Sequence, residues 1–287
     1  MTDQSLNAFL NGRWAPKSFR DLRPRLISGF MMLGGALAFL FAGSFPFALL
    51  VLVVALIMSW EWGRLVRAAS IDKSYLIHAI AVATALMFAI TGQPWAALIA
   101  IAIGAAALLP LNYGTNGRLS AFGVAYVGVP AIALIILRGD AFEGALAVLL
   151  VFILVWSADI AAFVGGRLVG GYKLWPSVSP NKTWAGFVFG VVASLAAALI
   201  FALTVTGAPL LYSGALGLGL GVLSQAGDLA ESALKRGHGV KDASDLIPGH
   251  GGVMDRMDGI VIVATVAVLM ALMVDAAAPA HALLFGP

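Results

Sequence analysis

Hydrophobic residues in this chain form long continuous stretches, separated by polar loops or by short turns rich in glycine and proline. A helix needs about 20 mostly apolar residues to cross the hydrocarbon core of a bilayer. We therefore predict an all-α, polytopic membrane protein with about nine transmembrane helices. The predicted spans cover residues 26–44, 46–62, 76–91, 95–111, 120–137, 144–164, 184–206, 209–226 and 259–278.

The composition supports a membrane location and narrows the partners. Of the 287 residues, 61% are hydrophobic and 11% are charged, whereas a soluble domain carries about 25% charged residues. The net charge of +3 is small, and no basic run is interleaved with aromatic residues, so nucleic acid is not an expected partner. The chain has no cysteine, so any metal ion would be bound by oxygen or imidazole ligands.

The distribution of basic residues predicts the orientation in the membrane. Short loops rich in lysine and arginine stay in the cytoplasm, and nine spans place every such residue except Arg138 on one side. We therefore expect the N terminus inside and the C terminus outside. The expected parts are a cytoplasmic or interfacial arm (residues 1–25), N-terminal transmembrane helices (26–140) and a catalytic transmembrane region with cytoplasmic loops (141–287).

The N-terminal arm is basic and runs into a long apolar segment, so we interpret it as a retained arm and not as a cleaved signal peptide. Apolar residues between Leu6 and Trp14 recur at helical spacing, as in an interfacial helix. A disordered tail fits these residues equally well.

The loop after the sixth predicted span contains a candidate acid and a candidate phosphate site. Asp159 lies at the membrane boundary, where a carboxylate is either functional or a helix-end group that reaches water. The loop ends in Ser179-Pro180-Asn181-Lys182-Thr183, and Ser before Pro predicts a helix N-cap followed by a first-turn proline. Free N–H groups beside Lys182 and Thr183 would suit a phosphate, although Pro, Lys and Trp also mark ordinary span starts.

Residues 228–258 carry the densest group of charges. If the eighth helix continues past its span, Asp228, Glu231 and Lys235 lie on one stripe at helical spacing. Asp255 and Asp258 open the ninth span, and an antiparallel helix pair would bring them opposite that stripe.

Four converging carboxylates need a cation near a low-dielectric membrane, and an all-oxygen ligand set suits Mg²⁺ that carries substrate phosphates. We therefore predict one or two metal ions held by Asp228, Glu231, Asp255 and Asp258. The alternative is a solvated loop whose acids pair with its own lysines and arginines. Glycines beside His250 would let backbone approach phosphate oxygens. Zinc at His238 and His250 is a weaker interpretation, because no second imidazole lies at helical ligand spacing.

Two motifs in this half of the chain resemble a known family. Ser232-Ala-Leu-Lys235-Arg236, then Lys241-Asp242, then Leu246-Ile-Pro-Gly-His250-Gly251-Gly252-Val-Met-Asp255-Arg256-Met-Asp258 is similar to the signature of phosphatidate cytidylyltransferases, or CDP-diacylglycerol synthases. The element from Ser179 to Thr183 resembles a shorter motif of the same family, with Asn181 where lysine is frequent. The first 150 residues resemble the family only in being hydrophobic spans.

The resemblance implies transfer of a cytidylyl group from CTP to phosphatidic acid, with magnesium, at the cytoplasmic face of the bacterial inner membrane. A homodimer is compatible with the sequence. The residues expected to take part in catalysis are Asp228, Lys235, Arg236, Asp255 and Asp258. Those expected to bind substrate phosphates or shape the CTP site are Ser179, Lys182, Thr183, Lys241, His250, Gly251, Gly252 and Arg256.

Two other functions remain open from the sequence. Intramembrane acids also mark transport paths, so a transporter of anionic metabolites is one alternative, although here the acids gather at one face. Another CTP-using lipid enzyme, such as a polyprenol kinase, is the second.

Overall fold

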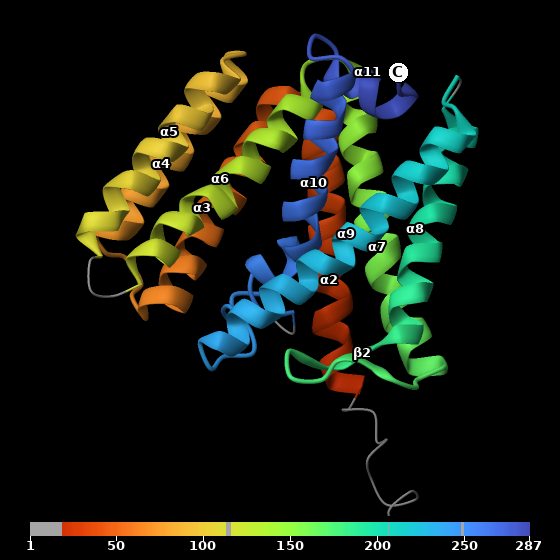
Figure 1. Ribbon diagram of the computed structural model, residues 1–287, viewed down its shortest axis with the longest axis horizontal. Helices are drawn as coiled ribbons and strands as arrows, with labels where there is room; N and C mark the ends of the chain where they lie inside the picture. Colours follow the sequence, from red (N-terminus) through yellow and green to blue (C-terminus); the bar gives the residue numbers. More distant parts are fainter. Residues whose placement is uncertain (1–18, 113–115, 206, 248–249) are drawn as a thin grey trace, which may run out of the picture.

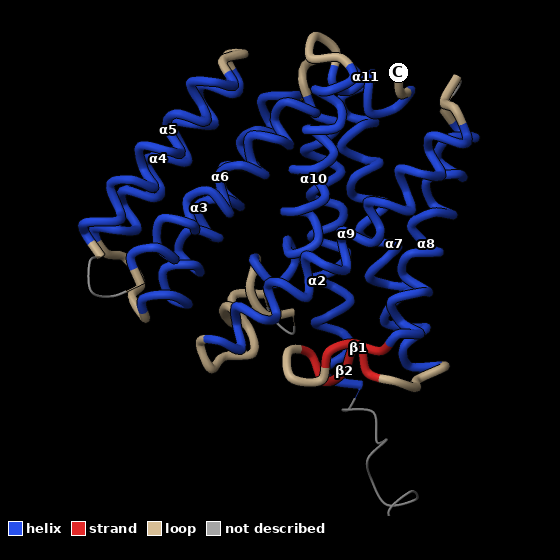
Figure 2. The backbone as a smooth tube through the Cα atoms, viewed as in Figure 1, coloured by secondary structure: helices blue, strands red, loops and turns tan. Residues whose placement is uncertain are grey.

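The computed structural model describes residues 19–112, 116–205, 207–247 and 250–287 (Figure 1). The interfacial helix expected between Leu6 and Trp14 lies outside this range, as do Pro248 and Gly249. The described chain forms ten helices and one two-stranded sheet (Figure 2). The helices are α2 (Phe19–Ala42), α3 (Ser44–Arg67), α4 (Lys73–Ile90), α5 (Pro94–Leu111), α6 (Gly117–Arg138), α7 (Phe142–Leu168), α8 (Trp184–Thr204), α9 (Leu210–Gly237), α10 (Met254–Val274) and α11 (Pro279–Phe285).

The helices confirm an all-α polytopic membrane protein. Within the described residues, eight helices, α3 to α10, are long and apolar enough to cross a membrane. The remaining predicted span, residues 26–44, falls on α2, a helix of 24 residues that ends at Ala42. The first turns of α2 carry Arg20, Arg23 and Arg25, so only the remainder of this helix has the composition of a membrane segment.

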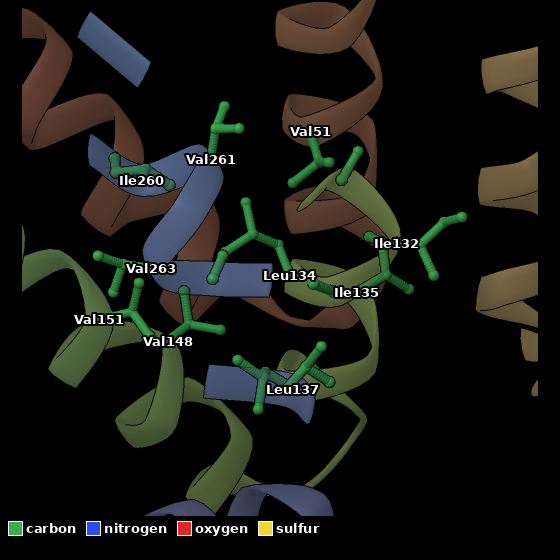
Figure 3. Packing of buried hydrophobic residues seen from close by; sticks show 14 of the residues in the cluster. Val51, Ile132, Leu134, Ile135, Leu137, Val148, Val151, Ile260, Val261 and Val263 are labelled. Carbon is green, nitrogen blue, oxygen red and sulfur yellow. The ribbon is translucent and has the colours of Figure 1, made fainter. Parts of the chain in front are cut away.

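Helices α3, α6, α7 and α10 form the apolar centre of the bundle. Figure 3 shows Leu134 of α6, Val148 of α7 and Val263 of α10 packed against one another, and all three are buried. Because lipid tails are as apolar as these side chains, helix association in a membrane depends on close packing and on small residues at the crossings.

Glycines set the crossing of α9 and α10 that the charged residues share. A Cβ atom on Gly227 would lie 2.7 Å from the carbonyl oxygen of Asp258, and one on Gly259 would lie 2.6 Å from Ser224 Oγ. Larger residues would push the two helices apart at this point. The crossing therefore brings the acidic end of α9 close to the first turns of α10.

The two strands correct the expected start of α8. Strand β1 (Lys173–Trp175) pairs antiparallel with β2 (Ser179–Thr183), with Lys173 opposite Thr183. Ser179 is therefore in a strand, and the prediction that it caps the helix is wrong. The cap is Thr183, whose Oγ1 accepts a hydrogen bond of 3.1 Å from the Gly186 N–H. Strand pairing keeps residues 179–183 extended, so the helix begins at Trp184.

The positions of the loops and of the C terminus at opposite ends of the bundle predict how the chain is oriented in the membrane. The loop after α9 and the β1–β2 hairpin lie at one end, and the C terminus lies at the other (Figure 1). With the basic end in the cytoplasm, a reporter fused after Pro287 should be periplasmic, and one inserted between Lys235 and Asp245 should be cytoplasmic. Reporters that reach the same compartment would contradict this arrangement.

Candidate active site

An open cavity of about 1650 Å³ extends between the helices and has one polar end. Its apolar walls come mainly from α2, α3, α6 and α7 and include Phe39, Phe47, Val51 and Phe152. The polar end is lined by Asp159, Lys182, Thr183, Asp228, Lys235, Asp242, His250, Asp255, Arg256 and Asp258. One continuous space therefore touches both the charged residues and the hydrophobic interior.

Lys182 and Asp228 join the two motifs at this polar end. The Lys182 Nζ lies 2.5 Å from Asp228 Oδ2, although the two residues are far apart in sequence. Helix α8 leaves the polar end and α9 returns to it, so a helical hairpin brings the two motifs to the same end of the bundle. Thr183 is buried beside Lys182, where its hydroxyl caps α8.

Lys235 occupies the centre of a buried group of charges. Helix α9 continues to Gly237, as the polar stripe predicted, and places Glu231 one turn before Lys235. The Lys235 Nζ lies 3.1 Å from Glu231 Oε1 and also contacts Asp255 Oδ1 of α10. All three residues are buried. Because a buried charge without a partner is costly, Lys235 stabilises both acids, and the two acids together stabilise Lys235.

Asp255 and Glu231 accept further hydrogen bonds from backbone N–H groups and from a tyrosine hydroxyl. Asp255 Oδ2 accepts hydrogen bonds from the Ala243 N–H at 2.9 Å and the Gly252 N–H at 2.8 Å. The Tyr126 hydroxyl donates to Glu231 Oε2 at 2.9 Å. Gly252, which was expected to shape the CTP site, thus donates its N–H to a carboxylate of the protein.

Asp258 and Asp159 add further negative charge at the same place. Asp258 interacts electrostatically with Asp228, Glu231 and Asp159, and Asp159 interacts with Lys182 and Arg256. The expected carboxylates therefore converge, but with lysines between them. In the part of the chain that the structure describes, no three acidic or histidine residues are arranged as a ready metal site.

Of the remaining predicted residues, some line the cavity and others are exposed away from the acids. Arg256 is exposed and lines the cavity, and His250 Nδ1 lies 2.8 Å from the Ser28 hydroxyl of α2. Gly251 has a φ of 81°, a conformation that favours glycine. Arg236 is exposed and donates to the Val240 carbonyl, and Lys241 is exposed in the following loop. The structure therefore does not bring these last two cations to the acids.

Sequence reasoning missed Glu61 and Tyr126. Glu61 of α3 is fully buried and accepts hydrogen bonds from the N–H groups of Val253 and Met254. An acid near the end of a predicted span is a functional hypothesis by default, so the sequence held a signal for Glu61. Tyr126 of α6 packs on Trp62 with ring centroids 4.9 Å apart, and no pattern in the sequence distinguishes it from an ordinary core aromatic.

Comparison with known proteins shows the family of the chain. The model of the cytidylyltransferase family matches residues 23–274. The chain belongs to this family. A Brucella suis phosphatidate cytidylyltransferase is 36% identical over 250 residues, which cover 85% of this chain and 91% of that protein. The Haemophilus influenzae phosphatidate cytidylyltransferase is 32% identical over 277 residues, which cover 83% and 94%.

A third relative is more similar to this chain over a shorter stretch. A phosphatidate cytidylyltransferase of Bacillus subtilis is 46% identical over 112 residues, which cover 39% of this chain and 42% of the relative. The family match includes residues 179–183 and 228–258, so both motifs of the polar end lie within it.

Proposed function

We propose that this protein is a phosphatidate cytidylyltransferase, which transfers a cytidylyl group from CTP to phosphatidic acid and releases pyrophosphate. The observation that carries the proposal is a cavity whose polar end is lined by residues of both motifs and whose walls are apolar. A nucleotide needs the charged end, and a diacyl lipid needs the apolar part. Both substrates then meet at the polar end.

The chemistry requires little proton transfer from the protein. The phosphate oxygen of phosphatidic acid attacks the α-phosphorus of CTP in line, a new P–O bond forms, and the bond to the β-phosphate breaks. The attacking phosphate is already ionised near neutral pH, so no general base is needed. Catalysis then depends on holding the two phosphates in line and on neutralising their charge.

The lysines at the polar end supply much of this neutralisation. Lys182 comes from the β2 end and Lys235 from α9, and both line the cavity, so phosphates placed there meet cations from two sides. Arg256 lines the cavity as well. Before substrates bind, the ion pairs with Asp228 and Asp255 keep these lysines in place.

Magnesium fits the acids at this end as a shared ligand of protein and substrate. Mg²⁺ is usually held by one or two carboxylates together with substrate phosphates and water, so a ready three-acid group is not required. Asp228 and Asp258 would hold the ion, with Glu231 and Asp255 beside them. When bound, it would neutralise charge on the triphosphate of CTP. The polar end would face the cytoplasm from the inner membrane, because the basic residues lie at that end.

Turnover by purified protein tests the activity. Radiolabelled CTP is incubated separately with each lipid of a panel. Phosphatidic acid should be the one lipid that gives labelled CDP-diacylglycerol. Asp228→Asn and Asp255→Asn should each lower the rate by about 100-fold or more, because the lysines and the metal ion that neutralise the phosphates lose an anionic partner. Asp140→Asn, at an exposed position outside the cavity, serves as the matched control. Phosphorylation of a polyprenol, or full turnover in both variants, would contradict the proposal.

Removal of divalent cations tests whether turnover requires Mg²⁺. Incubation with EDTA should abolish turnover, and added Mg²⁺ should restore it, whereas Zn²⁺ alone should not, because an all-oxygen ligand set suits a hard cation. Activity that survives thorough chelation would show that the acids serve only to pair with the lysines.

A further inference from the structure

Glu61 connects the N-terminal half of the chain to the polar end of the cavity, although it belongs to neither motif. It lies on α3 and is completely buried. Its Oε1 accepts hydrogen bonds from the Val253 N–H at 2.9 Å and the Ser244 hydroxyl at 2.5 Å, and its Oε2 accepts one from the Met254 N–H at 2.6 Å. Three donors thus converge on one carboxylate.

This carboxylate replaces a cap that α10 lacks. The first N–H groups of a helix have no partner within the helix, and the residue before α10 is Val253, which makes no side-chain cap. Glu61 supplies the acceptors from another helix. A negative charge is also favoured at this end of a helix dipole. The start of α10 is therefore fixed by a group outside its own segment.

The same backbone segment holds Asp255. The Gly252 N–H binds Asp255, and the next N–H, from Val253, binds Glu61. On the other side of the loop, the Ala243 N–H binds Asp255, and the neighbouring Ser244 hydroxyl binds Glu61. In each pair of neighbouring residues, 252–253 and 243–244, the first donates a hydrogen bond to Asp255 and the second donates one to Glu61. A displacement of Glu61 would free the backbone that aims Asp255 at Lys235.

Gly252 fits this arrangement for a steric reason. A Cβ atom at position 252 would lie 2.4 Å from Glu61 Oε1 and 3.0 Å from Ser244 Oγ. Any side chain here would collide with the carboxylate that holds the helix start. The glycine of the motif therefore provides room for Glu61 in addition to a donor for Asp255.

From this geometry we propose that Glu61 is a positioning residue of the cytidylyl transfer. It touches no substrate, since it does not line the cavity. It holds the segment from Gly252 to Met254 so that the Asp255 carboxylate stays against Lys235. The proposal rests on the function proposed above for Asp255 and Lys235.

Kinetics and hydrogen–deuterium exchange of Glu61→Gln, Glu61→Ala and Ser244→Ala test the role. Glutamine keeps one acceptor but turns an amide N–H toward the backbone donors, and alanine removes all acceptors. Since small misplacements of a reacting group cost up to about 100-fold in rate, kcat should fall about tenfold in Glu61→Gln and about 100-fold in Glu61→Ala. The KM values for CTP and phosphatidic acid should change little.

Exchange gives a readout that does not depend on turnover. Backbone amides of the peptide covering residues 250–257 should exchange faster in both Glu61 variants, whereas the peptides of α8 should not change. Ser244→Ala should show a weaker form of both effects and keeps the proposal testable if Glu61→Ala fails to fold. The control is Glu143→Gln, an exposed carboxylate on α7 that should alter neither readout.

Unchanged exchange at 250–257 in Glu61→Gln and Glu61→Ala would overturn the proposal, as would parental kcat in both variants. Asp255→Asn separates this failure from a failure of the proposed function. If Asp255→Asn is fully active, the assigned site is wrong, whereas an inactive Asp255→Asn beside fully active Glu61 variants overturns only the positioning role.

Discussion

The burial of Lys235 between Glu231 and Asp255 is the constraint on which the polar end of this protein depends. Charges removed from water are tolerated only when every one of them is paired and hydrogen-bonded. The structure meets this condition with groups from several elements, since Tyr126 binds Glu231, and the loop before α10 binds Asp255. The glycine crossing of α9 and α10 keeps the two helices close enough for these bonds.

The location of this group at one end of the bundle explains how a water-soluble and a lipid substrate are combined. The cavity runs from the charged end into apolar walls lined by residues such as Phe47 and Phe152. In the function that we propose, a lipid in this position would keep its acyl chains in a hydrophobic environment while its phosphate reaches Lys182 and Lys235. The membrane setting of the fold is thus part of the reaction that we propose.

Local patterns in the sequence predicted the parts of the site that lie along single helices. The stripe of Asp228, Glu231 and Lys235 was correct because α9 continues regularly to Gly237. The alternation of spans also placed Lys182 on the same side as the basic residues that follow α9, because a helical hairpin returns the chain to the same end.

Features that depend on tertiary pairing were not predicted. Ser179 was expected to cap α8, but pairing of Lys173 with Thr183 keeps that segment extended and makes Thr183 the cap. Glu61 binds residues almost two hundred positions away, and helical spacing alone carries no information on such a contact.

The central claim is that the element around Lys182 and the acids of α9 and α10 form one active site. Steady-state kinetics of Lys182→Ala and Thr183→Ala, with Lys73→Ala as an exposed control at the start of α4, test it most directly. We predict that each site variant raises KM for CTP or phosphatidic acid, or lowers kcat, and still folds in detergent. Parental kinetics for both substrates in both variants would contradict the shared site.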